Sequence, residues 1–156
     1  MKRVVLAALV FGLGALAYAQ GYFIGAEIIP HTFGTATYGI PYLTIGYDAG
    51  WGYASLGLAS PGRLNTWLSV SGGGSWPITT QTVLGGGLTF WLKLENFAIA
   101  DSTWAVNTSF LYRFGHNLGL LVRMHIPLMV DPNSFLFGSW FSFGLVYYIW
   151  SGAPGN

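Results

Sequence analysis

The side chains that could do chemistry in this chain are few, and two of them stand close together, Arg123 and His125. One residue separates them, so in an extended strand both side chains would point to the same side. An imidazole beside a guanidinium could act as a general base or bind a ligand. No nucleophile with an orienting acid is visible in the sequence. We therefore favour a hydrogen-bonding role for His125 and keep it as a weak candidate for catalysis.

The other charged side chains tend to share one face of their segments, with apolar side chains on the opposite face. A charged side chain that is held away from bulk water is stable only when it is paired with an opposite charge. We expect an interior network of ion pairs and hydrogen bonds, with Glu27 close to Arg123 or Lys93. Its role would be to satisfy a polar core, and a gate or proton path is the alternative. The predicted members are Glu27, Arg63, Lys93, Glu95, Arg113, Arg123 and His125.

Several kinds of site find no support in the sequence. The chain has no cysteine, which excludes disulfides, thiolate metal sites and the acylated cysteine of a lipoprotein. His31 and His116 fall in predicted connections on opposite sides of the fold, so neither could join His125 in a metal site. The run Gly85-Gly86-Gly87 lacks the Lys-Ser/Thr of a phosphate loop and predicts a close backbone approach or a bend. We expect no metal, no cofactor and, at a formal net charge of +1, no nucleic-acid partner.

Strands would position these residues, because apolar side chains alternate with polar or small ones over most of the chain. This alternation is typical of strands that turn one face toward an apolar phase. Segments with this pattern are bounded mostly by Gly, Pro, Asp and Asn, which favour turns. The eight predicted strands are Gly21–Ile29, Thr37–Tyr47, Trp51–Ser60, Arg63–Ser71, Thr80–Glu95, Thr103–Phe114, Leu118–Val130 and Phe135–Trp150.

The connections between these segments are predicted to be short. An even number of strands returns both ends of the chain to one side, as in the barrels of bacterial outer membranes. That side would carry turns at Asp48, Gly72–Gly74 and His116. The opposite side would carry His31–Ala36, Ser60–Gly62, Asn96–Ser102 and Asp131–Ser134.

The composition indicates that the apolar faces do not meet water. Only 7% of the residues are charged, against about 25% in soluble domains, while 17% are aromatic and 53% hydrophobic. In lipid, only helices and closed barrels satisfy every backbone polar group. The run Phe135–Trp150 is short for a helical span and contains Gly138 and Gly144. We predict an all-β fold, an eight-stranded antiparallel up-and-down transmembrane β-barrel; a single helical span and a soluble lipocalin-like barrel are the alternatives.

Residues 1–19 have the features of a cleaved secretory signal peptide. Met1-Lys2-Arg3 supplies the positive start, Val4–Leu16 the apolar run and Ala17-Tyr18-Ala19 the small-residue cleavage site. A retained anchor helix is the alternative, although the apolar run is short for a span. The expected organisation is a signal peptide at 1–19, a barrel at 20–150 and a C-terminal tail at 151–156.

The pattern Ser142-x-Gly144-x-x-Tyr147-x-Ile149 resembles the β-signal that the outer-membrane assembly machinery reads. That signal has a polar residue, a glycine and two hydrophobic residues spaced by two. With the strand count and the signal peptide, the chain is similar to the small eight-stranded outer-membrane proteins of bacteria. The resemblance implies a bacterial outer-membrane location, with outer-membrane lipids and the assembly machinery as partners. Proteins of this class usually finish on an aromatic residue, whereas this chain continues past Trp150.

Some small barrels are lipid A deacylases that use a His-x-Ser pair on one strand. The corresponding stretch here is His125-Ile126-Pro127, which has no serine. An eight-stranded barrel has room only for its own side chains or for one small ligand. We therefore expect a monomer or weak oligomer with a structural or interaction role at the cell envelope. The alternatives are a lipid-modifying enzyme that uses His125, and a narrow, porin-like channel or hydrophobic-ligand port.

Aromatic side chains are expected at the two edges of the apolar band. Tyr and Trp gather at membrane interfaces, where they form girdles around barrels. The outward aromatics predicted for these girdles are Tyr22, Tyr47, Trp104, Phe114, Phe141, Tyr147 and Trp150.

Overall fold

The computed structural model describes residues 21–33, 35–62, 65–96, 98–114, 117–128 and 141–151. Within these residues every regular element is a β-strand. The strands are β1 (Gly21–Phe33), β2 (Ala36–Asp48), β3 (Gly52–Gly62), β4 (Asn65–Pro77), β5 (Thr82–Glu95), β6 (Ala98–Arg113), β7 (Leu118–Pro127) and β8 (Phe141–Ser151). None of the described residues belongs to a helix long and apolar enough to cross a membrane.

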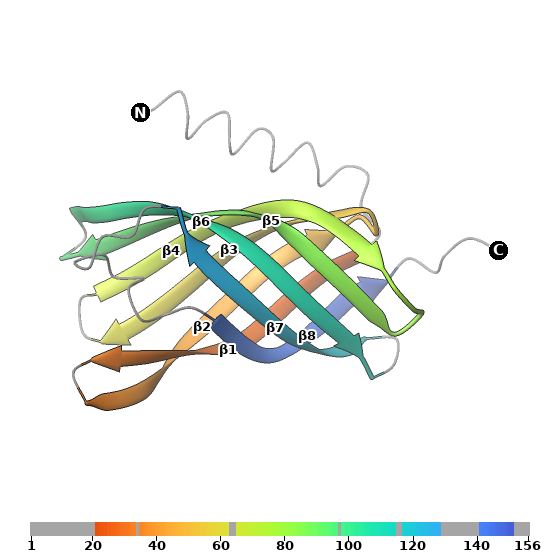
Figure 1. Ribbon diagram of the computed structural model, residues 1–156, viewed down its shortest axis with the longest axis horizontal. Coiled ribbons are helices and arrows are strands. Elements are labelled where there is room, and N and C mark those ends of the chain that lie inside the picture. The colour runs from red at the N-terminus through yellow and green to blue at the C-terminus, as the bar shows by residue number, and fades with distance from the viewer. Residues whose placement is uncertain are drawn as a thin grey trace, which may run out of the picture.

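The eight strands form a closed barrel in sequence order, as predicted. Each strand pairs antiparallel with the next, and the ring closes where β1 pairs with β8, from Gly21 opposite Ser151 to Ile28 opposite Phe143. Figure 1 shows the strands strongly tilted against the long axis of the barrel. We call the end that carries Gly21 and Ser151 the terminal end, and the opposite end, where β1 leads into β2, the hairpin end.

The two-residue alternation of the sequence becomes an inside and an outside. In β7, for example, Arg123 and His125 are buried, while Val122, Met124 and Ile126 are exposed. A side-chain period of two places alternate residues on opposite faces of a sheet, and closure turns one of those faces into an interior. The predicted division into inward and outward residues therefore holds along all eight strands, with one exception at Tyr47.

The outer face is apolar and carries no charge among the described residues. Large hydrophobic side chains stand exposed on every strand, such as Ile45 at 57%, Leu56 at 52% and Leu145 at 51%. Every described Asp, Glu, Lys and Arg falls at an inward-facing position of the alternation; these are Glu27, Asp48, Lys93, Glu95, Asp101, Arg113 and Arg123. The charged side chains thus turn inward and large apolar side chains cover the outside, whereas a water-soluble barrel carries its charges outside.

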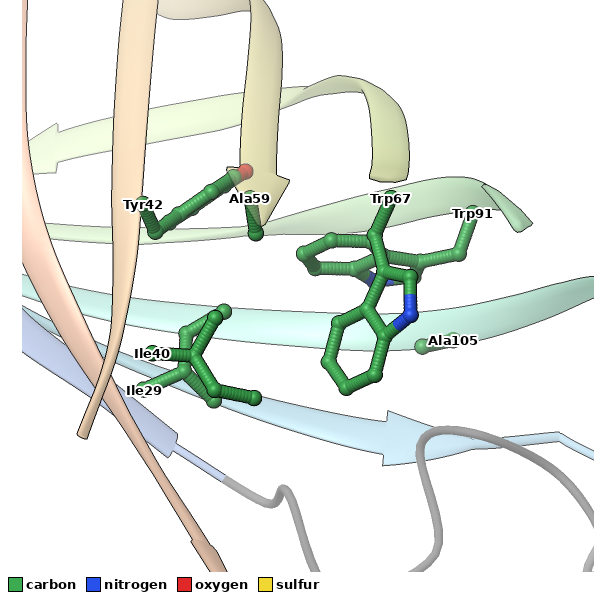
Figure 2. Close-up of a cluster of buried hydrophobic side chains, with 7 residues drawn as sticks. All are labelled: Ile29, Ile40, Tyr42, Ala59, Trp67, Trp91 and Ala105. Atoms are coloured by element: carbon green, nitrogen blue, oxygen red, sulfur yellow. The ribbon is translucent and has the colours of Figure 1, made fainter. Parts of the chain in front are cut away.

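Two clusters of buried apolar side chains fill the two ends of the interior. The aromatic cluster, toward the hairpin end, centres on the crossed indoles of Trp67 and Trp91, which Figure 2 shows beside Ile29 and Ile40. Its full membership is Ile29, Ile40, Tyr42, Ala59, Trp67, Trp91 and Ala105. The second cluster, toward the terminal end, consists of Phe23, Val83, Leu111, Leu121, Val146 and Tyr148. The residues between the two clusters are mostly polar.

The prediction that Gly72–Gly74 forms a turn is wrong, because β4 continues through these glycines to Pro77. Gly73 faces Gly87 in the register of β4 and β5, so two glycine runs lie side by side. A Cβ on Gly87 would stand 2.1 Å from the carbonyl oxygen of Gly72, which confirms the predicted close backbone approach. The turn lies instead at residues 78–81, where Thr79 Oγ1 accepts hydrogen bonds from the backbone N–H groups of Gln81 at 3.2 Å and of Thr82, the first residue of β5, at 3.0 Å.

Other predicted boundaries also move, because paired strands extend further than their hydrophobic pattern. His31 lies in β1, not in a connection, and Ser60–Gly62 belongs to β3. Residues 98–102 are part of β6, so the loop predicted at Asn96–Ser102 is shorter; Asn96 takes a positive φ of 50°, which asparagine tolerates. Tyr47 is predicted to be exposed on the outer face, but it is only 3% exposed, and its ring lies 5.5 Å from the ring of Tyr22.

Several predictions lie outside the described residues. They are the signal peptide at 1–19, the turn at His116, the loop Asp131–Ser134, the start of the last predicted strand at 135–140, and the tail beyond Ser151.

The closure of the barrel depends on a glycine, which yields a first prediction. A Cβ on Gly144 of β8 would lie 2.1 Å from the carbonyl oxygen of Ala26 and 2.5 Å from Cα of Glu27. These are backbone atoms of β1, so they cannot move without disturbing the pairing. We expect Gly144→Ala to lower the free energy of unfolding by about 1–3 kcal/mol, measured by denaturant titration with circular dichroism.

Gly72→Ala is the matched control, because it places the same methyl group on a strand glycine that has room for it. Its Cβ would come no closer than 3.6 Å, to the carbonyl oxygen of Tyr53. The alanine also restricts the unfolded chain, so stability should hold or rise by up to about 1 kcal/mol. Equal unfolding free energies for the two variants would contradict this account of the seam.

Candidate functional site

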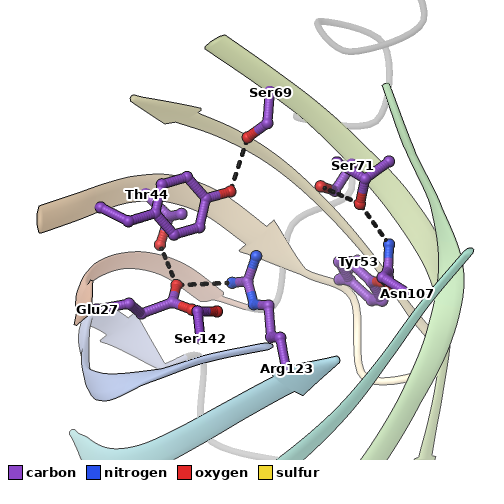
Figure 3. Close-up of polar contacts among 10 residues, drawn as sticks. Glu27, Thr44, Tyr53, Ser69, Ser71, Asn107, Arg123 and Ser142 are labelled. Carbon is purple, nitrogen blue, oxygen red and sulfur yellow. Dashed lines mark hydrogen bonds and ion pairs between the residues drawn. The ribbon is translucent and has the colours of Figure 1, made fainter. Parts of the chain in front are cut away.

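The centre of the interior is organised around the carboxylate of Glu27. Thr44 Oγ1 donates to its Oε1 at 3.2 Å, and Ser142 Oγ donates to its Oε2 at 2.6 Å. Arg123 Nη2 lies 3.5 Å from Oε1, and the side chains of this ion pair are 5% and 0% exposed for Arg123 and Glu27. Figure 3 shows that these groups reach the same point from β1, β2, β7 and β8. The carboxylate therefore ties together strands that lie far apart in the sequence.

A second set of hydrogen bonds lies across the barrel from Glu27. Tyr53 OH donates to Asn107 Oδ1, and Asn107 Nδ2 donates to Thr89 Oγ1 at 2.7 Å. The hydroxyls of Thr89 and Ser71 lie 2.9 Å apart. Figure 3 shows Tyr53, Asn107 and Ser71 of this hydrogen-bonded set beside the Glu27 group. Together the two groups form a polar layer between the two apolar clusters.

Asp48 holds a third polar group at the terminal end. Its Oδ2 accepts from Arg113 Nη2 and from Tyr148 OH, each at 3.3 Å. The guanidinium of Arg113 also stands 5.1 Å from the centre of the Tyr148 ring, in a cation–π arrangement. Asp48 Oδ1 accepts from the backbone N–H of Gly50 at 2.8 Å, which fixes the turn after β2. One carboxylate therefore stabilises both a turn and the mouth of the barrel.

The predicted interior charges do not form one network. Glu27 pairs with Arg123, as expected, rather than with Lys93. Lys93 instead pairs with Glu95 near the hairpin end, where their side chains are 26% and 45% exposed. Arg113 forms an ion pair with Asp48, for which the sequence predicts only a turn. Arg63 lies outside the described residues.

His125 is enclosed by the aromatic cluster. It is 1% exposed, and its ring lies 5.4 Å from the ring of Trp91 in an edge-to-face arrangement. Neither ring nitrogen has a hydrogen-bond partner among the described residues. The hydrogen-bonding role favoured for His125 is thus not seen, and no acid in the described part of the chain orients the imidazole. A base so enclosed could act on a substrate only after the aromatic cluster had moved.

The four residues of the predicted assembly signal divide between the two faces of β8. Ser142 and Gly144 point inward at the seam with β1, where one bonds Glu27 and the other permits close approach. Tyr147 and Ile149 point outward and are 52% and 58% exposed. The motif therefore combines inner residues that close the barrel with outer residues that are open to a partner.

No group of three His, Asp or Glu side chains that could hold a metal ion occurs in the described part of the chain. His31 lies toward the hairpin end, its ring 5.7 Å from that of Trp67, and is separated from His125 by the two indoles. Compared with known proteins, the sequence matches no family model, and no curated protein matches it either. The function is therefore argued from the geometry of the barrel.

Sequence reasoning missed the neutral half of the polar layer and the second carboxylate. Tyr53, Asn107 and Thr89 all occupy inward positions of the alternation, which was the available signal. Which of them bond to one another depends on strand register. Asp48 was obscured because Asp-Ala-Gly is also a good turn sequence.

The Glu27–Arg123 pair generates a second prediction. Glu27→Ala would leave a buried guanidinium without its counter-charge, which costs about 3–5 kcal/mol. We expect a lower denaturant midpoint by circular dichroism. The double variant Glu27→Gln, Arg123→Met removes both charges and should recover most of the loss.

Glu95→Ala is the control for the loss of a carboxylate from an ion pair. Because the Lys93–Glu95 pair is partly exposed, its removal should cost about 0–1 kcal/mol. A Glu27→Ala variant as stable as Glu95→Ala would show that the central pair does not support the fold.

Proposed function

We propose that this protein is an integral β-barrel of the bacterial outer membrane, filled by its own side chains, with a structural or interaction role at the cell envelope. The observation that carries the proposal is the distribution of charge. The described outer face holds exposed aliphatic and aromatic side chains and no Asp, Glu, Lys or Arg. Hydrocarbon is the environment that favours such a face, whereas a barrel dissolved in water would expose a large apolar surface.

The height of the apolar band supports the same proposal. Trp104 lies within β6 and Phe114 directly follows its last residue, and both side chains are exposed. A strand rises about 3.3 Å per residue, and at a tilt of 35–45° the span from 104 to 114 covers about 25 Å along the barrel axis. This is about the height of the apolar band of an outer-membrane barrel. Aromatic residues at these two levels would lie at the membrane interfaces, as predicted for the girdles.

The expected partners follow from the same surface. Outer-membrane lipids would cover the apolar band, and the assembly machinery would read the outward residues of β8, including Tyr147 and Ile149. Pairing of β1 with β8 closes the ring, so the strands need no second copy of the chain to complete the sheet and a monomer suffices.

The filled interior favours a structural role over the two alternatives. The polar layer occupies the centre of the barrel and the aromatic cluster fills the interior toward the hairpin end, which opposes an open pore. His125, the weak catalytic candidate, is buried beside Trp91 and lacks a neighbouring serine on its strand. We therefore propose neither a channel nor a lipid-modifying enzyme.

Leu145→Arg tests the membrane environment directly. Leu145 is 51% exposed at an outward position of β8, so in water an arginine would change stability by no more than about 0.5 kcal/mol. At the middle of a bilayer the same change costs about 2–4 kcal/mol. We expect that loss for the barrel folded into phospholipid vesicles, measured by guanidinium titration and by the heat-sensitive migration of the folded form on gels.

Thr80→Arg is the matched control, because Thr80 is exposed in the turn at residues 78–81 and would lie beyond the hydrocarbon. It should cost no more than about 1 kcal/mol in the same vesicles. Equal costs for the two arginines, or a folded chain that stays dissolved without lipid or detergent, would overturn the proposal.

A further inference from the structure

A cavity of about 40 Å³ lies inside the barrel between the polar layer and the terminal end. Apolar residues of the terminal cluster form part of its wall. Gly85 and five polar residues, Asp48, Tyr53, Ser75, Ser109 and Arg123, form the rest of the wall, and Tyr148 of the cluster adds its hydroxyl. A water molecule needs about 10–15 Å³ of such space and two to four polar partners, so the cavity can hold about three.

Arg123 gives this cavity a specific need for a hydrogen-bond acceptor. Its Nη2 faces Glu27, but its buried Nη1 has no acceptor among the described residues. A buried donor of a charged group is costly to leave unsatisfied. Because Arg123 lines the cavity, an acceptor placed there is within reach of the guanidinium.

The charges around the cavity favour a neutral occupant. Arg123 is balanced by Glu27, and Asp48 by Arg113, so the two ion pairs leave no net charge. Because the charges cancel within each pair, the walls neither hold a small ion in preference to water nor repel one by a net charge. Water, which both donates and accepts, suits the mixed wall of hydroxyls, carboxylate and guanidinium.

The two ends of the barrel differ in access to this space. At the terminal end, Asp48 lines the cavity and pairs with Arg113, whose side chain is 34% exposed, so polar groups continue from the cavity to solvent. Toward the hairpin end stand Thr89 and Trp91, both 0% exposed. The ring of Trp91 also packs against those of Trp67, Tyr42 and His125, at 6.4, 5.4 and 5.4 Å between centres.

We propose that this cavity is a hydrated chamber with one entrance. It binds about three water molecules, which complete the hydrogen bonding of Arg123 and exchange with solvent past Asp48, Arg113 and Tyr148. The polar layer and the aromatic cluster close it toward the hairpin end. The side chains thus fill the barrel except for this chamber, which opens to solvent at the terminal end alone and does not conduct. This proposal does not rest on the membrane location, because both mouths of a detergent-solubilised barrel face water.

Silver ions can test the chamber, because they approach water in size and bind thiolates. The natural chain has no cysteine, so an introduced cysteine is the only thiol and the assay of free thiol reports on that position alone. Ser109→Cys places the thiol in the wall of the cavity, and Ser75→Cys places another on a different strand of the same wall. Ser71→Cys is the matched control, since Ser71 also points inward and is 4% exposed but does not line the cavity.

The experiment follows the loss of free thiol in the folded full-length chain in detergent after addition of silver nitrate, with unfolded samples giving the total thiol. We expect Ser109→Cys and Ser75→Cys to react about tenfold faster or more than Ser71→Cys, because a sealed thiol must wait for local opening of the fold. Val83→Phe, which adds bulk to the cavity wall, should slow the reaction of Ser109→Cys.

Each outcome bears on the proposal. Slow reaction at both cavity positions, equal to that of Ser71→Cys, would overturn the hydrated chamber. Fast reaction at all three positions would overturn the barrier toward the hairpin end. Far-UV circular dichroism of each variant verifies that the barrel is folded, and the two cavity positions keep the test decisive if one variant fails to fold.

Discussion

Closure of the strand ring is the constraint on which the rest of this structure depends. The hydrogen bonds between β1 and β8 convert a twisted sheet with two faces into a cylinder with an inside and an outside. The seam is also the place where the inward carboxylate of Glu27 meets Ser142 and where Gly144 lets the two backbones approach. A ring of eight strands is so narrow that side chains fill it, and an inward polar group without a partner within reach is then costly.

The order of residues along the barrel axis brings most of these polar groups close to one another. Apolar side chains occupy both ends of the interior, and the charged and hydroxyl groups lie between them or at the mouths. Each described ion pair joins side chains that can neutralise one another locally, so no isolated charge is left in the low-dielectric centre. The arrangement makes the interior asymmetric. Bulky indoles seal one half, whereas inward glycines such as Gly85 leave room in the other.

The outer face and the inner face place opposite demands on the same strands. Each strand carries large apolar residues outward and its polar residues, together with the apolar residues of the two clusters, inward, and the same backbone hydrogen bonds support both faces. This explains how a chain with so few charged residues can be stable: the charges are concentrated where they pair with one another. It also explains why the function proposed here rests on surfaces rather than on a reactive group. The imidazole that could do chemistry is enclosed by aromatic rings.

The sequence by itself determined the strand count, the antiparallel closed barrel and the face on which most residues lie, because a period of two is a local property of the chain. Arg123 and His125 could be placed inside on that basis. Tertiary structure alone decided the partners, such as Arg113 with Asp48, because pairing depends on the register between strands. It also decided that Gly72–Gly74 continues a strand. Glycine predicts a turn when only its own neighbours are considered, but here a second glycine run on β5 lies opposite, and the close contact of the two backbones favours the extended form.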